Sequence, residues 1–140
     1  MNSMERLLTE RDCLSTVLAF FAGLDAHTDA DVVAQLSADC VWERNGEHLA
    51  GHAAVMSALA NRPADRTTCH AVSNVRFEVL DDTHVIARFF LIVFEGVAAT
   101  ARHEAAFRLA AIRDCTDTLS LRGQRWLIDT KRSRLATSHP

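Results

Sequence analysis

The sequence predicts an α+β fold in which three N-terminal helices pack on one face of a curved antiparallel sheet. Apolar residues recur at helical spacing up to about residue 61, and they alternate with period two from Thr67 onward. Helices with a small hairpin therefore precede a four-stranded meander, which is typical of the α+β class. With 140 residues, nearly half of them hydrophobic, the chain suits one domain spanning residues 1–140.

The first helix is predicted over residues 4–26. Its apolar residues at helical spacing are Leu7, Leu14, Leu18 and Phe21. Asp25 continues this stripe, which is expected to pack against the sheet. Because a buried carboxylate is costly unless it is hydrogen-bonded or paired, Asp25 either faces a pocket or ends the helix in solvent.

Two shorter helices and a hairpin follow. The predicted ranges are a helix from Thr28 to about Leu36, a hairpin over residues 39–50 and a helix over residues 51–61. Thr28 followed by Asp31 resembles a capping box. Asn45-Gly46 is a strong hairpin turn signal, and Arg62-Pro63 ends the third helix.

Four strands are predicted over residues 67–80, 84–95, 102–118 and 125–135. Their lengths of about 10 to 15 residues favour a curved sheet with bulges. A sheet that curls around a long helix cannot fill its concave side, so the open end is a natural pocket for a small ligand.

Charge and composition exclude several classes of function. The net charge is −3 with acids and bases interspersed, so no basic stripe indicates a nucleic-acid partner and no polybasic cluster indicates a membrane surface. The longest apolar run, residues 89–94, is far too short to span a bilayer. The N-terminus does not resemble a signal peptide, so we expect a cytoplasmic protein.

The four cysteines are Cys13, Cys40, Cys69 and Cys115, and none forms a CxxC pair. We expect reduced thiols that behave as small buried apolar residues. Cys69 and His70 are neighbours on a predicted strand, so their side chains should point to opposite faces, which argues against a Cys–His catalytic pair.

His70 is the candidate acid–base residue. If the strand runs regularly, His70, Val72 and Asn74 share one face. A carboxylate from Asp25 on the facing helix would bond one ring nitrogen and leave the other for proton transfer, while Asn74 or Trp42 would position a substrate. The alternative is a structural histidine, with Asn74 pinning a bulge.

The remaining motifs are weaker. Phe89 and Phe107 are candidates for the pocket wall, although aromatic residues are core by default. Several cations are expected at exposed sheet positions or a dimer rim: Arg88, Arg108, Lys131, Arg132 and Arg134. His48 and His52, which are spaced as HxxxH, flank the predicted hairpin, and no HExxH motif indicates a metal site. No glycine-rich loop indicates a phosphate site, and no GxSxG motif indicates a serine nucleophile.

Several segments, taken in their order along the chain, resemble those of one family. These are residues 20–25, 29–31, 39–42, the third-helix start at 51–55, the His-x-x-x-Asn strand at 70–74, and the closing segments at 117–119, 122–128 and 131–132. Together they resemble SnoaL-like proteins of the nuclear transport factor 2-like (NTF2-like) superfamily. The resemblance implies a cone-shaped α+β barrel, an internal apolar pocket and usually a homodimer through the sheet.

The same positions resemble the Asp–His pair of scytalone dehydratase and bile-acid dehydratases. The resemblance implies that Asp25 orients His70, which acts as acid and base. The chain departs from those enzymes because it has no tyrosine. Leu24 stands where a tyrosine is expected, and Phe89 or its neighbour stands where a second histidine is expected.

Two hypotheses follow. The first is a cofactor-independent dehydratase, isomerase or cyclase that acts on a small apolar cyclic or polyketide-like molecule through Asp25 and His70. The second is a non-catalytic ligand-binding or scaffold protein related to the small subunits of ring-hydroxylating dioxygenases, for which a trimer is expected instead of a homodimer.

Overall fold

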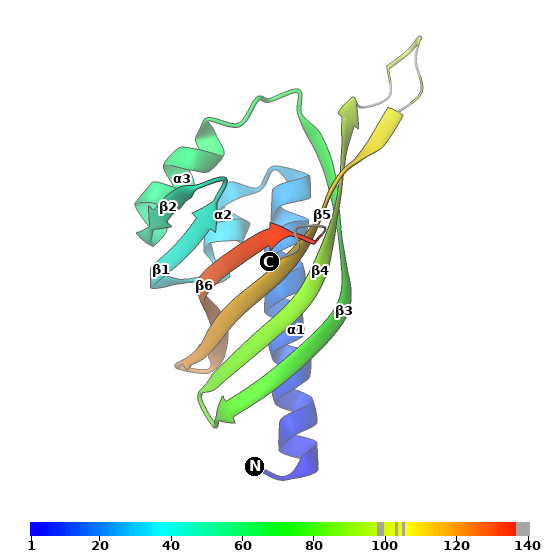
Figure 1. Ribbon diagram of the computed structural model, residues 1–140. Coiled ribbons are helices and arrows are strands. Elements are labelled where there is room, and N and C mark those ends of the chain that lie inside the picture. Colours follow the sequence, from blue (N-terminus) through cyan, green and yellow to red (C-terminus); the bar gives the residue numbers. More distant parts are fainter. Residues whose placement is uncertain (98–99, 103, 105, 137–140) are drawn as a thin grey trace.

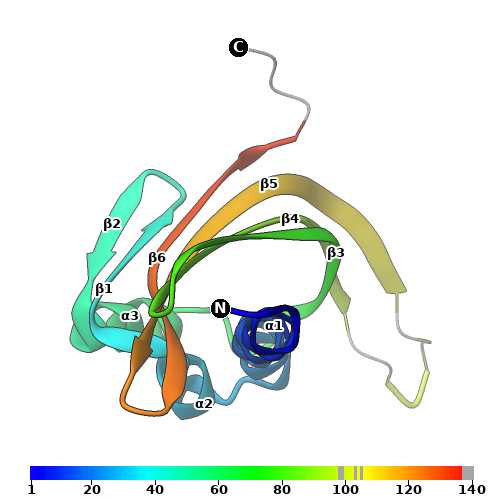
Figure 2. The same ribbon diagram turned by 90° about the horizontal axis from the view of Figure 1, so that it is seen from below.

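The computed structural model describes residues 1–97, 100–102, 104 and 106–136. Its elements, in order, are α1 (Ser3–Ala26), α2 (Asp29–Val33), β1 (Leu36–Arg44), β2 (Glu47–Ala50), α3 (Gly51–Ala60), β3 (Thr67–Asp81), β4 (His84–Val97), β5 (Ala106–Arg122) and β6 (Arg125–Leu135) (Figure 1). The predicted α+β class is confirmed. The sheet curves around α1, which lies on its concave side (Figure 2).

The strands form one six-stranded sheet in the order β2-β1-β6-β5-β4-β3. Strands β3 to β6 make the predicted antiparallel meander. The hairpin of β1 and β2 also joins this sheet, because β1 pairs with β6 in parallel. This parallel pairing of β1 with β6 was not among the predictions. Parallel pairing joins segments that are far apart in the chain, and local periodicity does not reveal it.

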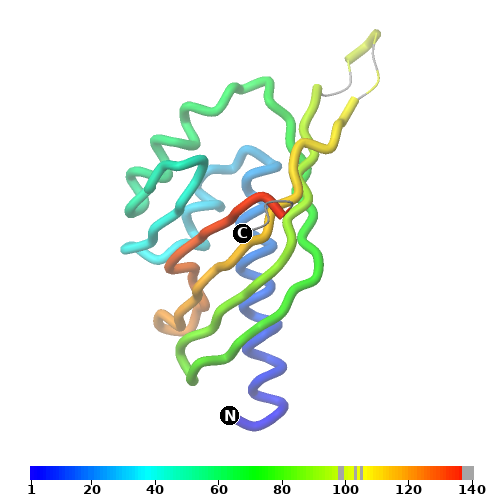
Figure 3. Tube along the Cα trace, in the orientation of Figure 1, coloured from blue at the N-terminus to red at the C-terminus, as the bar shows by residue number. Residues whose placement is uncertain are grey.

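Helix α1 begins at a capping box that satisfies its first free N–H groups. The Glu5 backbone N–H donates to Oδ1 of Asn2 at 2.9 Å, and the Asn2 backbone N–H donates to Oε2 of Glu5 at 2.7 Å. The helix ends at His27, which adopts the left-handed conformation (φ 56°). These caps set the ends of a helix long enough to reach along the sheet, as Figure 3 shows.

The buried face of α1 differs from the predicted stripe. Leu7 is 61% exposed and Leu18 is 45% exposed. The face that packs on the sheet consists of Cys13, Thr16, Val17, Phe20, Phe21, Gly23 and Leu24. The first turns of α1 extend beyond the sheet (Figure 1), so Leu7 has little to pack against. Phe21 belongs to both stripes.

Helix α2 is shorter than predicted, since it ends at Val33 and β1 starts at Leu36. Thr28 precedes α2, but its side chain makes no capping hydrogen bond there. Its hydroxyl donates instead to the Gly23 carbonyl at 3.4 Å. The predicted capping box was therefore wrong, because the end of α1 uses the Thr28 hydroxyl.

Two bulges decide which strand residues face inward. The register between β3 and β4 shifts between Ser73 and Arg76, and Asn74 there has a φ of 55°. The register between β5 and β6 shifts between Thr118 and Leu119. Because side chains alternate across a strand, each shift moves the following residues to the other face.

The ends of the strands otherwise lie close to prediction, except for β5. That strand runs over Ala106–Arg122 instead of residues 102–118, and residues 103 and 105 of the predicted range lie outside the described residues. Asn45 and Gly46 form the predicted turn between β1 and β2, with φ values of 50° and 81°.

The core lies between α1 and the concave face of the sheet. Phe20, Phe89 and Ile128 are fully buried within it. Cys13, Cys40 and Cys115 are buried thiols as predicted, whereas Cys69 is exposed, contrary to prediction. In the part of the chain that is described, no helix is both long and apolar enough to cross a membrane.

Candidate active site

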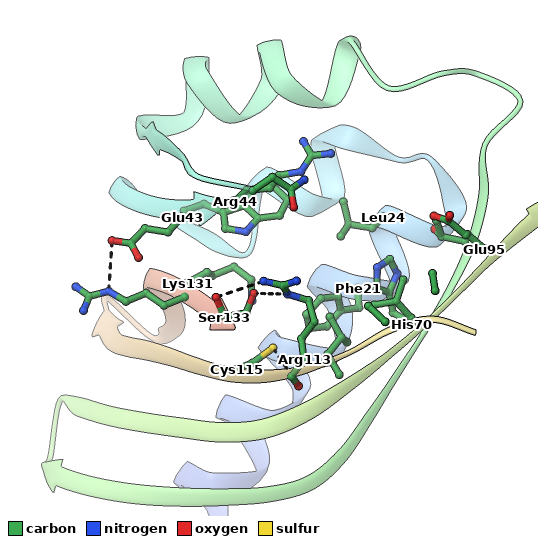
Figure 4. A pocket seen from close by; sticks show the side chains of 18 of the residues that line it. Phe21, Leu24, Glu43, Arg44, His70, Glu95, Arg113, Cys115, Lys131 and Ser133 are labelled. Carbon is green, nitrogen blue, oxygen red and sulfur yellow. Dashed lines mark hydrogen bonds and ion pairs between the residues drawn. The ribbon is translucent and has the colours of Figure 1, made fainter. Parts of the chain in front are cut away.

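A cavity of about 340 Å³ lies between the concave face of the sheet, the end of α1 and the segment after α3. That volume is typical of small-ligand sites. Phe21, Leu24, Leu59, Leu91 and Val93 supply apolar lining, and His70 belongs to the same wall. Figure 4 shows Phe21 and Leu24 of α1 together with His70 of β3 in this part of the lining.

Asp25 and His70 are joined by two hydrogen bonds across this wall. Nδ1 of His70 lies 2.5 Å from Oδ1 of Asp25, and the His70 backbone N–H donates to Oδ2 at 2.8 Å. Thr68 adds a third bond, from its hydroxyl to Oδ1 at 2.8 Å. The end of α1 is thereby fixed to the start of β3.

These contacts set the protonation of the pair. Burial acts to raise the pKa of Asp25, but the hydrogen bonds and charge of His70 and the Thr68 hydroxyl outweigh it, so the pKa lies below its ordinary 3.8. An ionised carboxylate only accepts hydrogen bonds, so Nδ1 of His70 carries the proton. Nε2 of His70 makes no hydrogen bond with any described residue and is left for a molecule in the cavity.

Aromatic rings hold the imidazole from the other side. The Phe21 ring stacks on His70 with centroids 5.3 Å apart, and Phe89 meets Phe21 edge-on at 6.0 Å. Phe21 and His70 accordingly lie side by side in Figure 4. Trp42 also lines the cavity and packs edge-on against Phe20 at 5.2 Å.

A second buried pair also lines the cavity. Nζ of Lys131 lies 2.6 Å from Oδ2 of Asp117, and both residues are at most 5% exposed. The Lys131 ammonium also lies 4.2 Å from the Phe20 ring centre and 4.7 Å from that of Phe21. Burial raises the pKa of Asp117, against the attraction of Lys131. The expectation of an exposed Lys131 was wrong, because the bulge before it turns the side chain inward.

The structure does not bring the other predicted residues to the cavity. Asn74 is exposed at the β3 bulge, where its Oδ1 accepts a hydrogen bond from the Ser73 hydroxyl at 2.6 Å. Phe107 is 45% exposed and Phe89 is fully buried. Among the described residues that line the cavity, none of these three is included. Phe89 instead packs edge-on against Phe21, which does line the cavity.

Sequence reasoning missed the charged part of the lining. The cations there are Arg44, Arg62, Arg66, Arg113, Lys131 and Arg132, and the acids are Glu43, Glu95 and Asp117. The lining is therefore apolar and charged, not apolar throughout. Cations scattered over four segments of the sequence give no local signal of a shared site.

No group of three or more His, Cys, Asp or Glu side chains in the described parts of the chain is arranged to hold a metal ion. The chemical groups that the cavity itself offers are an imidazole held by a carboxylate, a buried ion pair and guanidinium groups.

Comparisons with known proteins show the family to which this chain belongs. The profile of the SnoaL-like domain family matches residues 5–132. No curated protein sequence is similar enough to count as a match. The solved structures give the fold.

The hexachlorocyclohexane dehydrochlorinase LinA type 2 superposes with a TM-score of 0.80 at 13% identity, over 99% of this chain and 93% of that one. A candidate scytalone dehydratase from Novosphingobium aromaticivorans DSM 12444 gives 0.80 at 14%, over 99% and 93%. ActVI-ORFA from Streptomyces coelicolor gives 0.77 at 14%, over 93% and 98%. At these identities the structural likeness shows the fold alone. The match to the family profile over most of the chain shows that this protein belongs to the SnoaL-like family.

Proposed function

We propose that this protein is a cofactor-independent acid–base enzyme that removes a proton from a small, largely apolar cyclic or polyketide-like molecule. Dehydration, isomerisation and cyclisation all begin with such a step. The observation that carries the proposal is His70 in the wall of a cavity, with its Nδ1 2.5 Å from Oδ1 of Asp25, which does not itself line the cavity.

The expected mechanism uses the free ring nitrogen of His70. Nε2 accepts a proton from a carbon next to a carbonyl or hydroxyl group of the substrate. The carboxylate of Asp25 holds the imidazole in the tautomer that leaves Nε2 unprotonated, and it stabilises the imidazolium that forms. The same proton can then be returned to a leaving hydroxyl, which gives elimination of water, or to another carbon, which gives isomerisation.

Among these reactions, the names of the similar structures favour elimination. One is named a dehydrochlorinase and another a candidate dehydratase, and both names describe the loss of a proton with a leaving group. Those activities belong to those proteins. They guide which compounds to try first on this one.

The test uses solvent deuterium, which reports proton abstraction without knowledge of the product. Apolar cyclic ketones and β-hydroxy ketones are incubated with the protein in D₂O, and mass spectrometry detects deuterium uptake or loss of water. We expect the wild type to act on some of them and His70→Ala to lose about 10²- to 10⁴-fold in rate.

The chain offers a matched control in a second His–Asp pair. His84 and Asp81 also lie 3.0 Å apart, but both are exposed and outside the described lining of the cavity. His84→Ala should leave the rate unchanged. Full activity in His70→Ala, or an equal loss in His84→Ala, would refute the assignment. Ligand binding without exchange would favour the non-catalytic alternative.

A homodimer through the outer face of the sheet is part of the proposal. Leu91 and Val93 point into the cavity, so their neighbours Phe90, Ile92 and Phe94 point outward. Ile112 pairs with Ile92 across the strands and is 40% exposed. An apolar outer face of this kind suits contact with a second copy.

A further inference from the structure

Three arginines from two segments of the chain meet at one end of the cavity. Arg44 ends β1, Arg62 follows α3 and Arg66 precedes β3. All three line the cavity, and all three also line an adjoining hollow of about 260 Å³. We call these residues the arginine cluster. It separates the cavity from the adjoining hollow.

Only some of the hydrogen-bond donors of the Arg62 side chain have partners among the described residues. Its Nη1 donates to the Leu24 carbonyl at 3.2 Å, and its Nη2 donates to Oδ1 of Asp29 at 3.3 Å. The side chain is 10% exposed, yet its Nε–H is buried without a hydrogen-bond partner among the described residues. Buried donors are normally paired, so the protein alone leaves the hydrogen-bonding capacity of Arg62 incompletely used.

Within the arginine cluster, the positive charge of Arg44 is the least compensated by other residues. The Arg44 side chain makes no hydrogen bond or ion pair with any residue that the structure describes, and its guanidinium lies over the Trp42 ring at 5.3 Å. Burial lowers the pKa of Arg44, and the charges of Arg66 and Arg62 lower it further, against the attraction of Glu47. The three guanidinium groups therefore repel one another across a partly desolvated space.

Among the described residues, the nearby carboxylates form ion pairs with only two of the three arginines. Asp29 pairs with Arg62, and Glu95 pairs with Arg66 at 3.1 Å. Glu95 is shared, because it also pairs with Arg108. Arg44 forms no ion pair with a described residue, although the charge of Glu47 attracts it, and an anion placed between the arginines would relieve the repulsion.

We propose that the arginine cluster binds an oxyanion of the ligand, so that the molecule entering the cavity is an apolar ring system carrying a carboxylate or a phosphate group. The guanidinium fork matches such groups with two parallel N–H donors. The apolar part would lie against Phe21, Leu24 and Leu59 on the way to His70. The placement of the reactive part at His70 rests on the proposed function, whereas anion binding does not.

The test compares probes of the same shape and different charge by calorimetric titration at low salt. 2-Naphthoate carries the carboxylate, 2-naphthamide is its neutral counterpart, and 2-naphthyl phosphate carries a phosphate. We expect one of the two anions to bind about 10- to 100-fold more tightly than the amide. Arg44→Gln should reduce that preference to a few-fold, because Arg44 makes no structural hydrogen bond that the substitution would break.

Two further variants separate a local site from overall charge. Arg66→Gln should weaken the preference even if Arg44→Gln perturbs Trp42. Arg88→Gln removes the same charge from an exposed residue that pairs with Glu78 outside the described lining of the cavity, so it should leave the preference unchanged. Equal binding of the anions and the amide, or an unchanged preference in both Arg44→Gln and Arg66→Gln, would overturn the proposal.

The remaining outcomes identify the anion and keep the two proposals apart. Tighter binding of the naphthyl phosphate, with competition by inorganic phosphate, assigns the cluster to phosphate; tighter binding of naphthoate assigns it to carboxylate. His70→Ala should keep the full preference. If it does and deuterium exchange is absent, only the acid–base function fails; if exchange occurs without any anion preference, only the arginine cluster fails.

Discussion

Asp25 accepts hydrogen bonds from both the ring and the backbone of His70, so one carboxylate fixes the side chain and the main chain of the same residue. The ring bond sets the tautomer, and the backbone bond anchors the start of β3 to the end of α1. Asp25 therefore contributes to stability and, in the proposed mechanism, to catalysis. The two contributions can be measured separately.

Replacement of Asp25 by Asn should lower stability in a pH-dependent way. The folded-state pKa of Asp25 lies below the unfolded value of 3.8. The unfolded chain thus binds more protons between the two values, so the stabilisation is present above pH 3.8 and is lost as the pH falls through the folded-state pKa. We expect Asp25→Asn to cost about 1–3 kcal/mol at neutral pH.

Urea unfolding of wild type and Asp25→Asn at several pH values measures this difference. The gap between the two proteins should narrow below about pH 4. Asp82→Asn, at an exposed position of the turn between β3 and β4, provides the control at neutral pH and should leave the free energy of unfolding nearly unchanged. A gap for Asp25→Asn that is constant from neutral to acid pH would contradict the linkage.

The Lys131–Asp117 pair should show strong coupling. Lys131→Met leaves Asp117 buried without its partner, and loss of one member of a buried pair costs about 3–5 kcal/mol. The double variant Lys131→Met, Asp117→Leu removes both charges and should be more stable than the Lys131→Met single variant. A double-mutant cycle in urea checks this. Additive effects of the two changes would show that the pair is not coupled.

The thiols should differ sharply in reactivity. Burial is the main cause that raises the pKa of Cys13 and of Cys115 to about 12, so both remain protonated at neutral pH, and burial also raises the pKa of Cys40. Cys69 is exposed. Titration of the native wild type with a chromogenic disulfide at pH 8 should therefore show one fast-reacting thiol, and the denatured wild type should show four. The fast-reacting thiol should be absent in native Cys69→Ser. Fast reaction in Cys69→Ser would contradict this.

The proposed dimer should depend on the outer face of the sheet. Ile112→Arg places a charge at an exposed apolar position beside Ile92, which is expected to separate the two copies because a buried unpaired charge is costly. Analytical ultracentrifugation compares its mass with that of wild type. Leu18→Arg, on the exposed side of α1, is the control and should keep the wild-type mass. A monomeric wild type would refute the dimer.

Sequence periodicity was enough to predict the element types and their order, because period-3.6 and period-2 patterns reflect one buried face in each helix and strand. The sequence also pointed to Asp25 and His70, since a carboxylate at the end of an apolar helix face and a histidine on a facing strand suggest a shared pocket. Only the tertiary structure decided how close they lie, because that distance depends on the pairing of α1 with β3.

Tertiary structure also decided which polar residues face inward. Val72 packs against the core, and so do Val75 and Phe77, which have the opposite parity; the bulge at Asn74 makes this possible and moves Asn74 to the surface. A second bulge turns Lys131 inward to Asp117. Each bulge inserts one residue against the partner strand, and a single sequence shows no sign of the partner's register. The arginine cluster was equally hidden, because the end of β1 and the segment between α3 and β3 meet only when the chain folds.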